Sequence, residues 1–170
     1  MQVIRSITVD APLGEVWRVA GTEFADAHLW ASSIDASRPR DVESMCDAAP
    51  VAGRSCETSL GPVHETVLDY DEVNHILRYE AFAEGMPGFV RRLVNTWTLS
   101  TAPNNATVVE MNLDVVISTP FNMFMGPLMK LKLGGVLNQA LVDLKHYAET
   151  SRPSHAKVKA IAKQKKNAAA

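Results

Sequence analysis

The apolar and polar positions divide the chain into a strand-rich first part and one long apolar segment near its end. Residues 120–149 are apolar over most of a helical surface, and their polar residues gather mainly near the end of the segment. A helix that is apolar almost all round must be buried or must line something. The pattern therefore predicts a helix over residues 120–149 that the rest of the chain covers. The Gly126-Pro127 pair predicts that a short helix precedes the main one.

Before this helix, the sequence alternates with the period of β-strands. Alternating apolar and polar positions, bounded by glycine, proline, asparagine and aspartate, predict short strands joined by turns. The expected strands cover residues 3–9, 34–38, 53–60, 63–70, 76–83, 89–101 and 107–118, and two short helices lie between the first two of them. Strands joined by hairpins imply an antiparallel sheet. The predicted class is α+β, with the sheet wrapped around the long helix.

The same alternation predicts which side chains face the helix. On the strand over residues 89–101, the face with Asn95 and Trp97 is the more apolar one, so we expect it to point inward. Tyr79 and Met111 are expected on the inward faces of their own strands. Asn95 then lies among apolar neighbours, and a buried asparagine must be hydrogen-bonded by the protein, by water or by a ligand.

Two charged residues are also expected on the inner face. On the third strand the face with Arg54 is favoured over the face with Ser55, and Glu65 shares a face with Val63 and Val67. A carboxylate that points inward has a raised pKa unless it is paired, which suits a general acid or base, and Arg54 is a candidate partner. Ion pairs across strands are also common without catalysis, so the structural and the catalytic interpretation both stay open.

Charge is distributed unevenly along the chain. Its 170 residues include 19 acidic residues and 17 lysines and arginines, for a formal net charge of −2. All the acidic residues lie within residues 1–150, whereas six of the basic ones lie within 151–170, so the two parts carry −8 and +6. An acidic body argues against nucleic-acid binding by the domain itself. We expect one domain over residues 1–150 and a basic C-terminal tail, either a flexible, solvated appendage or a contact for anionic partners.

Several other classes of function find no support in the sequence. No apolar run reaches about 18 residues without a charge, so no membrane span is predicted. Residues 1–5 enter a strand directly and lack the apolar stretch of a secretion signal, which predicts a cytoplasmic protein with Cys46 and Cys56 as free thiols. The five histidines lack metal-binding spacing, and no phosphate-binding glycine loop is present. We therefore expect neither a metal nor a cofactor.

A set of short motifs within the first 150 residues points to one superfamily. They comprise Ile7-x-Val9-x-Ala11-Pro12-x-x-x-Val16-Trp17, Trp30, Gly53, Glu65, Asp71, Leu77-x-Tyr79 and Leu144-Lys145-x-Tyr147-x-Glu149. In these features the chain resembles the SRPBCC superfamily, the START-like, helix-grip group that includes polyketide cyclases and dehydrases, aromatase/cyclases and lipid carriers. The resemblance implies a seven-stranded antiparallel sheet curved around the C-terminal helix, with an elongated cavity between them. The tail after Ser151 lies outside it.

A cavity between a curved sheet and a helix would be mostly apolar, with a few polar groups that fix the orientation of a ligand. The residues expected to line it are Arg54, Glu65, Tyr79, Asn95, Trp97, Met111, Phe124, Met125 and Leu128. The leading hypothesis is a protein that binds a hydrophobic small molecule, lipid-like, aromatic or polyketide-like. The alternative is a cyclase or dehydratase in which the polar members of this set move protons. A third hypothesis is a protein-interaction module that uses the helix or the basic tail.

Overall fold

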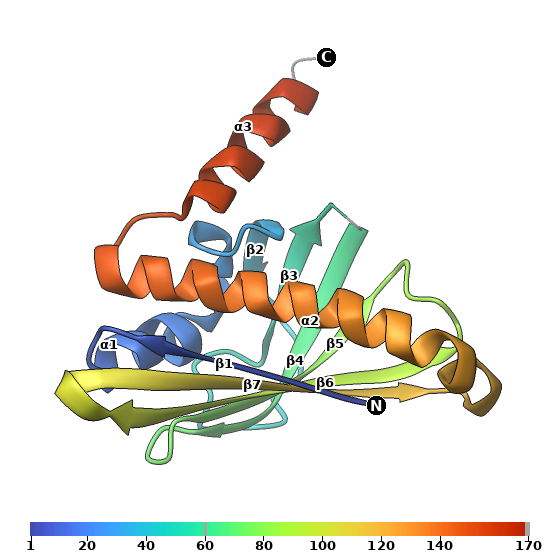
Figure 1. Ribbon diagram of the computed structural model, residues 1–170, viewed down its shortest axis with the longest axis horizontal. Helices are drawn as coiled ribbons and strands as arrows, with labels where there is room; N and C mark the ends of the chain where they lie inside the picture. Colours follow the sequence, from blue (N-terminus) through green and yellow to red (C-terminus); the bar gives the residue numbers. More distant parts are fainter. Residues whose placement is uncertain (60, 169–170) are drawn as a thin grey trace.

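A seven-stranded antiparallel sheet forms the body of the protein, and the long helix α2 lies across one of its faces (Figure 1). The computed structural model describes residues 1–59 and 61–168, and the side chains of all of these except 120–125 and 167–168. Leu60, which the expected strand over 53–60 included, lies outside the described residues. The strands are β1 (Gln2–Val9), β2 (Ile34–Pro39), β3 (Gly53–Thr58), β4 (Gly61–Asp71), β5 (Ile76–Ala83), β6 (Val90–Ala102) and β7 (Ala106–Ile117).

The strand order in the sheet is β1-β7-β6-β5-β4-β3-β2, and each neighbouring pair is antiparallel. Strands β2 to β7 therefore follow one another as a meander, and β1 closes the order beside β7. The helices are α1 (Leu13–Trp17), the π-helical turn η1 (Arg18–Thr22), the 3-10 segments η2 (Phe24–Leu29) and η3 (Pro103–Asn105), α2 (Thr119–Thr150) and α3 (His155–Ala168). The α+β class, the seven strands and the long C-terminal helix predicted from the sequence are confirmed.

Helix α2 is continuous, so the predicted break at Gly126-Pro127 is wrong. Pro127 lies inside the 32-residue helix. A proline normally ends a helix partly because its ring clashes with the Cβ of the preceding residue, and Gly126 has no Cβ. The proline still costs the helix the hydrogen bond that its missing N–H would have donated, and its ring still crowds the carbonyl one turn earlier.

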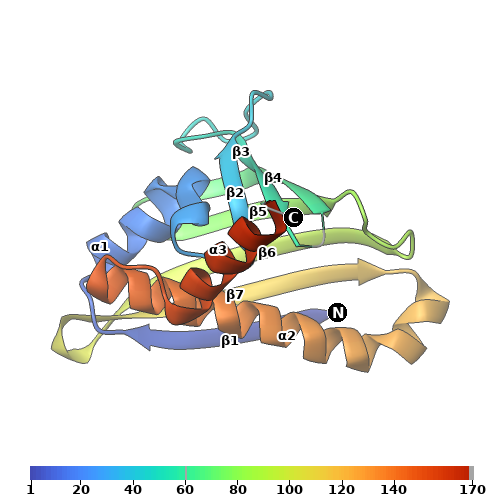
Figure 2. The same cartoon turned by 90° about the horizontal axis from the view of Figure 1, so that it is seen from above.

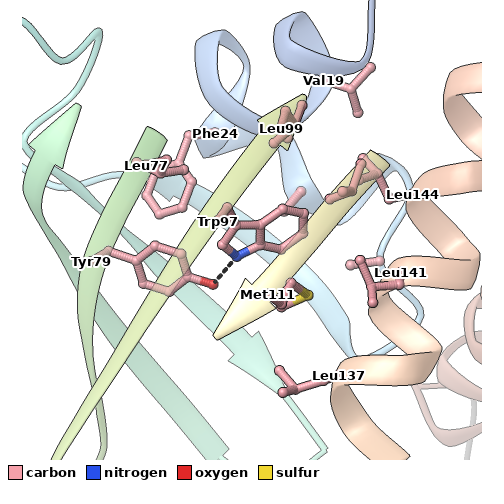
Figure 3. Packing of buried hydrophobic residues seen from close by; sticks show 14 of the residues in the cluster. Val19, Phe24, Leu77, Tyr79, Trp97, Leu99, Met111, Leu137, Leu141 and Leu144 are labelled. Atoms are coloured by element: carbon pink, nitrogen blue, oxygen red, sulfur yellow. Dashed lines mark hydrogen bonds between the residues drawn. The ribbon is translucent and has the colours of Figure 1, made fainter. Parts of the chain in front are cut away.

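Only the second half of α2 is buried as the apolar pattern led us to expect. Leu137, Leu141 and Leu144 are almost fully buried against the sheet (Figure 3). Burial of each such leucine stabilises the fold by about 1.5–3 kcal/mol. In the first half, Leu128 and Leu131 expose 49% and 73% of their surfaces. The helix is therefore held by its C-terminal turns and leaves apolar surface uncovered near its start.

A cluster of polar contacts holds the end of α2 against the end of β1. The Lys145 ammonium donates to the carbonyl of Thr8 at 2.9 Å and to the Asp10 carboxylate at 3.2 Å, and it also pairs with Glu149 one turn later. The Glu149 carboxylate accepts a bond from the backbone N–H of Asp10 at 2.7 Å. These contacts give Lys145 and Glu149, four residues apart at the end of α2, a structural role.

The short helices close one end of the sheet's inner face. They lie over the sheet on the side where α2 ends (Figure 2). Phe24 stacks on Tyr79 with ring centroids 5.1 Å apart, and Trp30 meets Trp97 edge-on at 6.4 Å. Such aromatic pairs add about 0.5–1.5 kcal/mol beyond the burial of their area. We refer to this part of the inner face, centred on Tyr79 and Trp97, as the closed end.

The segment expected as a basic tail forms helix α3, and its first turn is fixed to the domain. Ser154 caps the helix by accepting the backbone N–H of Lys157 at 3.1 Å, and its hydroxyl donates to Asp143 of α2 at 2.5 Å. The buried Asp143 carboxylate also accepts the backbone N–H of Ser32 at 2.8 Å. The Lys157 ammonium donates to the carbonyl of Ile34 at 2.6 Å, and burial lowers the pKa of Lys157.

Two neighbouring glycines of α2 offer a matched test of how closely the helix approaches β1. A Cβ on Gly134 would lie 2.3 Å from Nη2 of Arg5, whose Nη1 donates to the carbonyl of Ile4 at 2.7 Å; a Cβ on Gly135 would meet nothing within 4 Å. Replacing a helical glycine by alanine stabilises a helix by up to about 1 kcal/mol. We expect this full gain in the free energy of unfolding for Gly135→Ala. Gly134→Ala should gain clearly less, because Arg5 must move, and urea unfolding of both variants measures the difference. Equal gains would contradict the close approach.

Candidate functional site

Four buried polar side chains lie next to one another on the inner face of the sheet. Arg54 of β3 is paired in register with Glu65 of β4, and Tyr79 of β5 with Asn95 of β6. All four are less than a tenth exposed. The two pairs are offset along the strands, because Glu65 lies opposite Ala81 and Tyr79 lies opposite Val67. The four side chains therefore follow a diagonal across β3, β4, β5 and β6, which we call the polar row. The strand period predicted this inward orientation correctly, whereas a role in ligand binding stays a prediction.

Arg54 and Glu65 form a buried ion pair that also reaches the short helices. Nε of Arg54 donates to the Glu65 carboxylate, and Nη1 donates to the carbonyl of Phe24 at 2.5 Å. The guanidinium lies 3.9 Å from the centroid of the Phe24 ring. Burial is the largest single influence and acts to lower the pKa of Arg54, but the attractions of Glu65, Tyr79 and Cys56 together outweigh it and raise that pKa above its ordinary value. Arg54 is therefore a fixed positive charge and does not supply protons.

Tyr79 is the acceptor for two neighbouring side chains. Its hydroxyl oxygen accepts Nδ2–H of Asn95 at 2.9 Å and Nε1–H of Trp97 at 3.3 Å, and Figure 3 shows the second of these bonds. Burial raises the pKa of Tyr79, and the negative charge of Glu65 raises it further. The phenol therefore stays protonated near neutral pH, so it acts as a hydrogen-bonding group and not as a base.

Asn95 is the member of the polar row that has an atom without any hydrogen-bond partner among the described residues. Its Oδ1 is buried and has no partner there. Turning the amide over would let the Tyr79 hydroxyl donate to Oδ1 but would leave the amide N–H groups unpartnered in its place. Leaving a buried polar group unpaired costs about 1–3 kcal/mol. The site therefore offers one hydrogen bond to an incoming group.

The predicted apolar contacts of the site divide into two groups. Trp97 and Met111 belong to the closed end, where helix residues pack over them (Figure 3), and both are almost fully buried. Leu128 lies on α2 and is half exposed. The side chains of Phe124 and Met125 lie outside the described residues.

Beyond Asn95 the inner face is less completely covered. The residues that are only partly buried there, although they pack against the same core, are Val63, Leu93, Ile117, Met129 and Leu133. The short helices lie over the opposite end of the sheet (Figure 2). We call this part the open end; Asn95 lies between it and the closed end. Val63 and Ile117 were not among the predicted contacts, although strand alternation places them on the same faces as Glu65 and Met111.

Two surface pockets among the described residues lie away from the polar row. One of about 400 Å³ lies between α3 and the start of β2, lined by Ser32, Asp35, Ser59 and Lys163 among others. The second, of about 470 Å³, is lined by residues 40 and 42–45 after β2 together with Thr66. Within the described part of the chain, histidine, cysteine and carboxylate side chains form no group that would hold a metal ion. None of the described helices is long and apolar enough to cross a membrane.

The buried ion pair can be compared with an exposed one in the same sheet. Removing one partner of a buried pair costs about 3–5 kcal/mol, because it leaves the other charge uncompensated. We expect Glu65→Gln to lower the free energy of unfolding by this amount. Glu80→Gln, which removes the partner of the half-exposed Arg92, should cost less than about 1 kcal/mol. Urea denaturation measures both, and equal losses would show that the Arg54–Glu65 pair is not buried as described.

The two free thiols differ in their surroundings. The rate at which each reacts with a disulfide reagent therefore tests the burial of the inner face of the sheet. Cys56 points inward beside Arg54, and burial raises the pKa of its thiol to about 12, whereas Cys46 is half-buried in the loop before β3. Only a thiolate reacts with a disulfide reagent. At mildly alkaline pH we expect one thiol to react quickly and one to react only on unfolding. Cys46→Ser should remove the fast phase; two fast thiols would contradict the burial of Cys56.

Comparisons with known proteins agree with this architecture. A search of curated proteins finds no match. Among solved structures, a START superfamily protein from Mycobacterium smegmatis superimposes with a TM-score of 0.68 at 13% identity, over 87% of this chain and 97% of that one. An uncharacterised protein from Bacillus thuringiensis gives 0.70 at 14% identity, over 87% and 98%. Norcoclaurine synthase from Thalictrum flavum, a point mutant in complex with a transition-state analogue, gives 0.64 at 11% identity, over 88% and 96%.

At these identities the structural matches establish the fold alone. The family model described as "Polyketide cyclase / dehydrase and lipid transport" matches residues 1–149, which leaves only α3 and the turn before it outside the match. The chain therefore belongs to the polyketide cyclase/dehydrase and lipid transport family.

Proposed function

We propose that the protein binds a hydrophobic small molecule, lipid-like or aromatic, between the open end of the sheet and α2, with a polar group of the ligand bonded to Asn95. The observation that carries this proposal is the unpartnered Oδ1 of Asn95 at the border of partly buried apolar surface. A ligand with an apolar body and one hydroxyl or other donor would satisfy both features. The family description, which includes lipid transport, supports the same class of ligand.

The apolar part of the site favours a ligand of adaptable shape. Met129 and Leu133 of α2 and Leu93 and Ile117 of the sheet pack against the same core, and all four are only partly buried. Methionine and leucine adapt to varied apolar shapes, methionine especially, because its unbranched chain turns easily. A bound apolar body would remove this surface from water, at about 25 cal/mol for each Å² covered.

The second candidate function is a cyclase or dehydratase that acts on such a ligand, and the convergence of the polar row favours it. Arg54 and Tyr79 stay protonated, so proton abstraction would fall to Glu65. A neutral Tyr79 beside a fixed guanidinium suits the stabilisation of a developing oxyanion. One variant distinguishes the two candidate functions. In folded Glu65→Gln protein, turnover of a ligand would be abolished, whereas binding through Asn95 would remain.

A matched pair of asparagine variants tests the binding proposal. Asn95 lies on the inner face, whereas Asn112, whose Oδ1 is also unpartnered among the described residues, pairs with Thr96 on the outer face. The probes are long-chain alcohols and polycyclic phenols, followed by the rise in melting temperature that each causes. We expect Asn95→Leu to weaken binding of a hydroxyl-bearing probe by about tenfold, the value of one net hydrogen bond, and Asn112→Leu to leave it unchanged.

An apolar probe of the same size but without the hydroxyl completes the design. Its binding should be equal in Asn95→Leu and in the original protein, because it makes no bond to the amide. The proposal fails if no probe raises the melting temperature, or if both asparagine variants respond alike. Mass spectrometry of molecules that co-purify with the protein provides the natural ligand class.

A further inference from the structure

Helix α3 carries a concentrated positive charge. Lys159, Lys163 and Lys166 follow the spacing of one helical face, and Lys165 lies outside that face; all four are exposed, and Lys163 also lines the pocket between α3 and the start of β2. No acidic residue follows Glu149 in the chain, so nothing within α3 neutralises them. The opposite side of the helix faces the domain through the buried Lys157 and its partly buried neighbours.

The helix is fixed in direction and projects from the body. It leaves the C-terminal end of α2 and points away from the sheet (Figure 1). The bond from Ser154 to the buried Asp143 and the bond from Lys157 to the carbonyl of Ile34 tie its first turn to α2 and β2. A basic helix held at its base presents its charges in one orientation, which a disordered segment of the same composition does not do.

The charge of the remaining protein restricts where an anionic surface can approach. Residues 1–150 carry a net charge of −8 and residues 151–170 carry +6. An extended anionic surface would be repelled by the body and attracted by α3, so it would meet the protein at this helix. Each lysine near an anionic bilayer contributes about 1 kcal/mol of attraction.

The exposed side of α3 also carries apolar groups among its lysines. Val158 exposes 51% of its surface, and Ala162 one turn later is exposed as well. A lipid surface accommodates such side chains at the boundary between headgroups and acyl chains, whereas a phosphate backbone in water does not. These positions favour a bilayer over a nucleic acid as the occupant.

We propose that α3 docks the protein on anionic lipid bilayers, with Lys159, Lys163, Lys165 and Lys166 against the headgroups. Attachment would hold the protein at a bilayer, the reservoir of sparingly soluble apolar molecules; the use of that reservoir rests on the proposed function, whereas the attachment does not. The contact is electrostatic, so it weakens as salt rises.

The test is co-sedimentation of the full-length protein with vesicles of phosphatidylglycerol and phosphatidylcholine, compared with vesicles of phosphatidylcholine alone. We expect binding only to the anionic vesicles, at low salt, and its loss at high salt. Changing Lys159, Lys163, Lys165 and Lys166 together to glutamine, which keeps helix propensity, should weaken partitioning by at least about 100-fold. The matched control changes four exposed cations outside α3 to glutamine: Arg38, Arg78, Lys130 and Lys132.

The control has the same net charge as the α3 variant, so it should retain most of the binding if position matters. The proposal is overturned if the full-length protein does not bind anionic vesicles, if both variants lose binding equally, or if double-stranded DNA binds more tightly than the vesicles. Melting-temperature shifts with the apolar probes, measured without vesicles, should be the same in both variants. If those shifts are absent while vesicle binding persists, the proposed ligand site fails and the attachment through α3 stands.

Discussion

The inner face of the sheet must be kept from water, and the way it is covered decides the rest of the structure. A curved sheet with one apolar face requires a second layer. Here the layer is shared: the short helices and the last turns of α2 fill the closed end, while the first half of α2 covers the open end only partly. The two ends consequently differ. Packing at the closed end stabilises the fold, whereas the open end keeps apolar surface that a small molecule could cover.

The polar row lies between the closed end and the open end. Arg54 and Glu65 are held by each other and by the carbonyl of Phe24, so their bonds are made within the protein. Asn95, two strands away, lacks a partner for Oδ1 among the described residues. One pair on this face therefore joins β3, β4 and the short helices, whereas the Asn95 amide keeps one oxygen unpartnered among the described residues, to which the proposed ligand would bond. The raised pKa values of Arg54 and Tyr79 limit the proton chemistry of the row.

Periodicity predicted those features of the fold that depend on neighbours in the sequence. It placed the seven strands and pointed Arg54, Glu65, Tyr79 and Asn95 inward. It failed for Pro127, which lies inside α2; the preceding Gly126 removes one of the clashes that a proline makes in a helix. It also did not predict the division into a closed and an open end, since that depends on which distant aromatic residues reach the sheet. The fixed first turn of α3 depends on a contact between Ser154 and Asp143, for which the pattern carries no signal.

In each of the two outermost strands of the sheet, β1 and β2, a backbone carbonyl is bound by a cationic side chain. At β1, a guanidinium group of Arg5 binds the carbonyl of Ile4, and at β2 the ammonium group of Lys157 binds the carbonyl of Ile34. Unpaired backbone groups at a sheet edge are a template on which other chains add strands and aggregate. A cation on each edge occupies one of these groups and would place a positive charge against any incoming strand. Helix α3, which supplies Lys157, thus also takes part in keeping separate molecules apart.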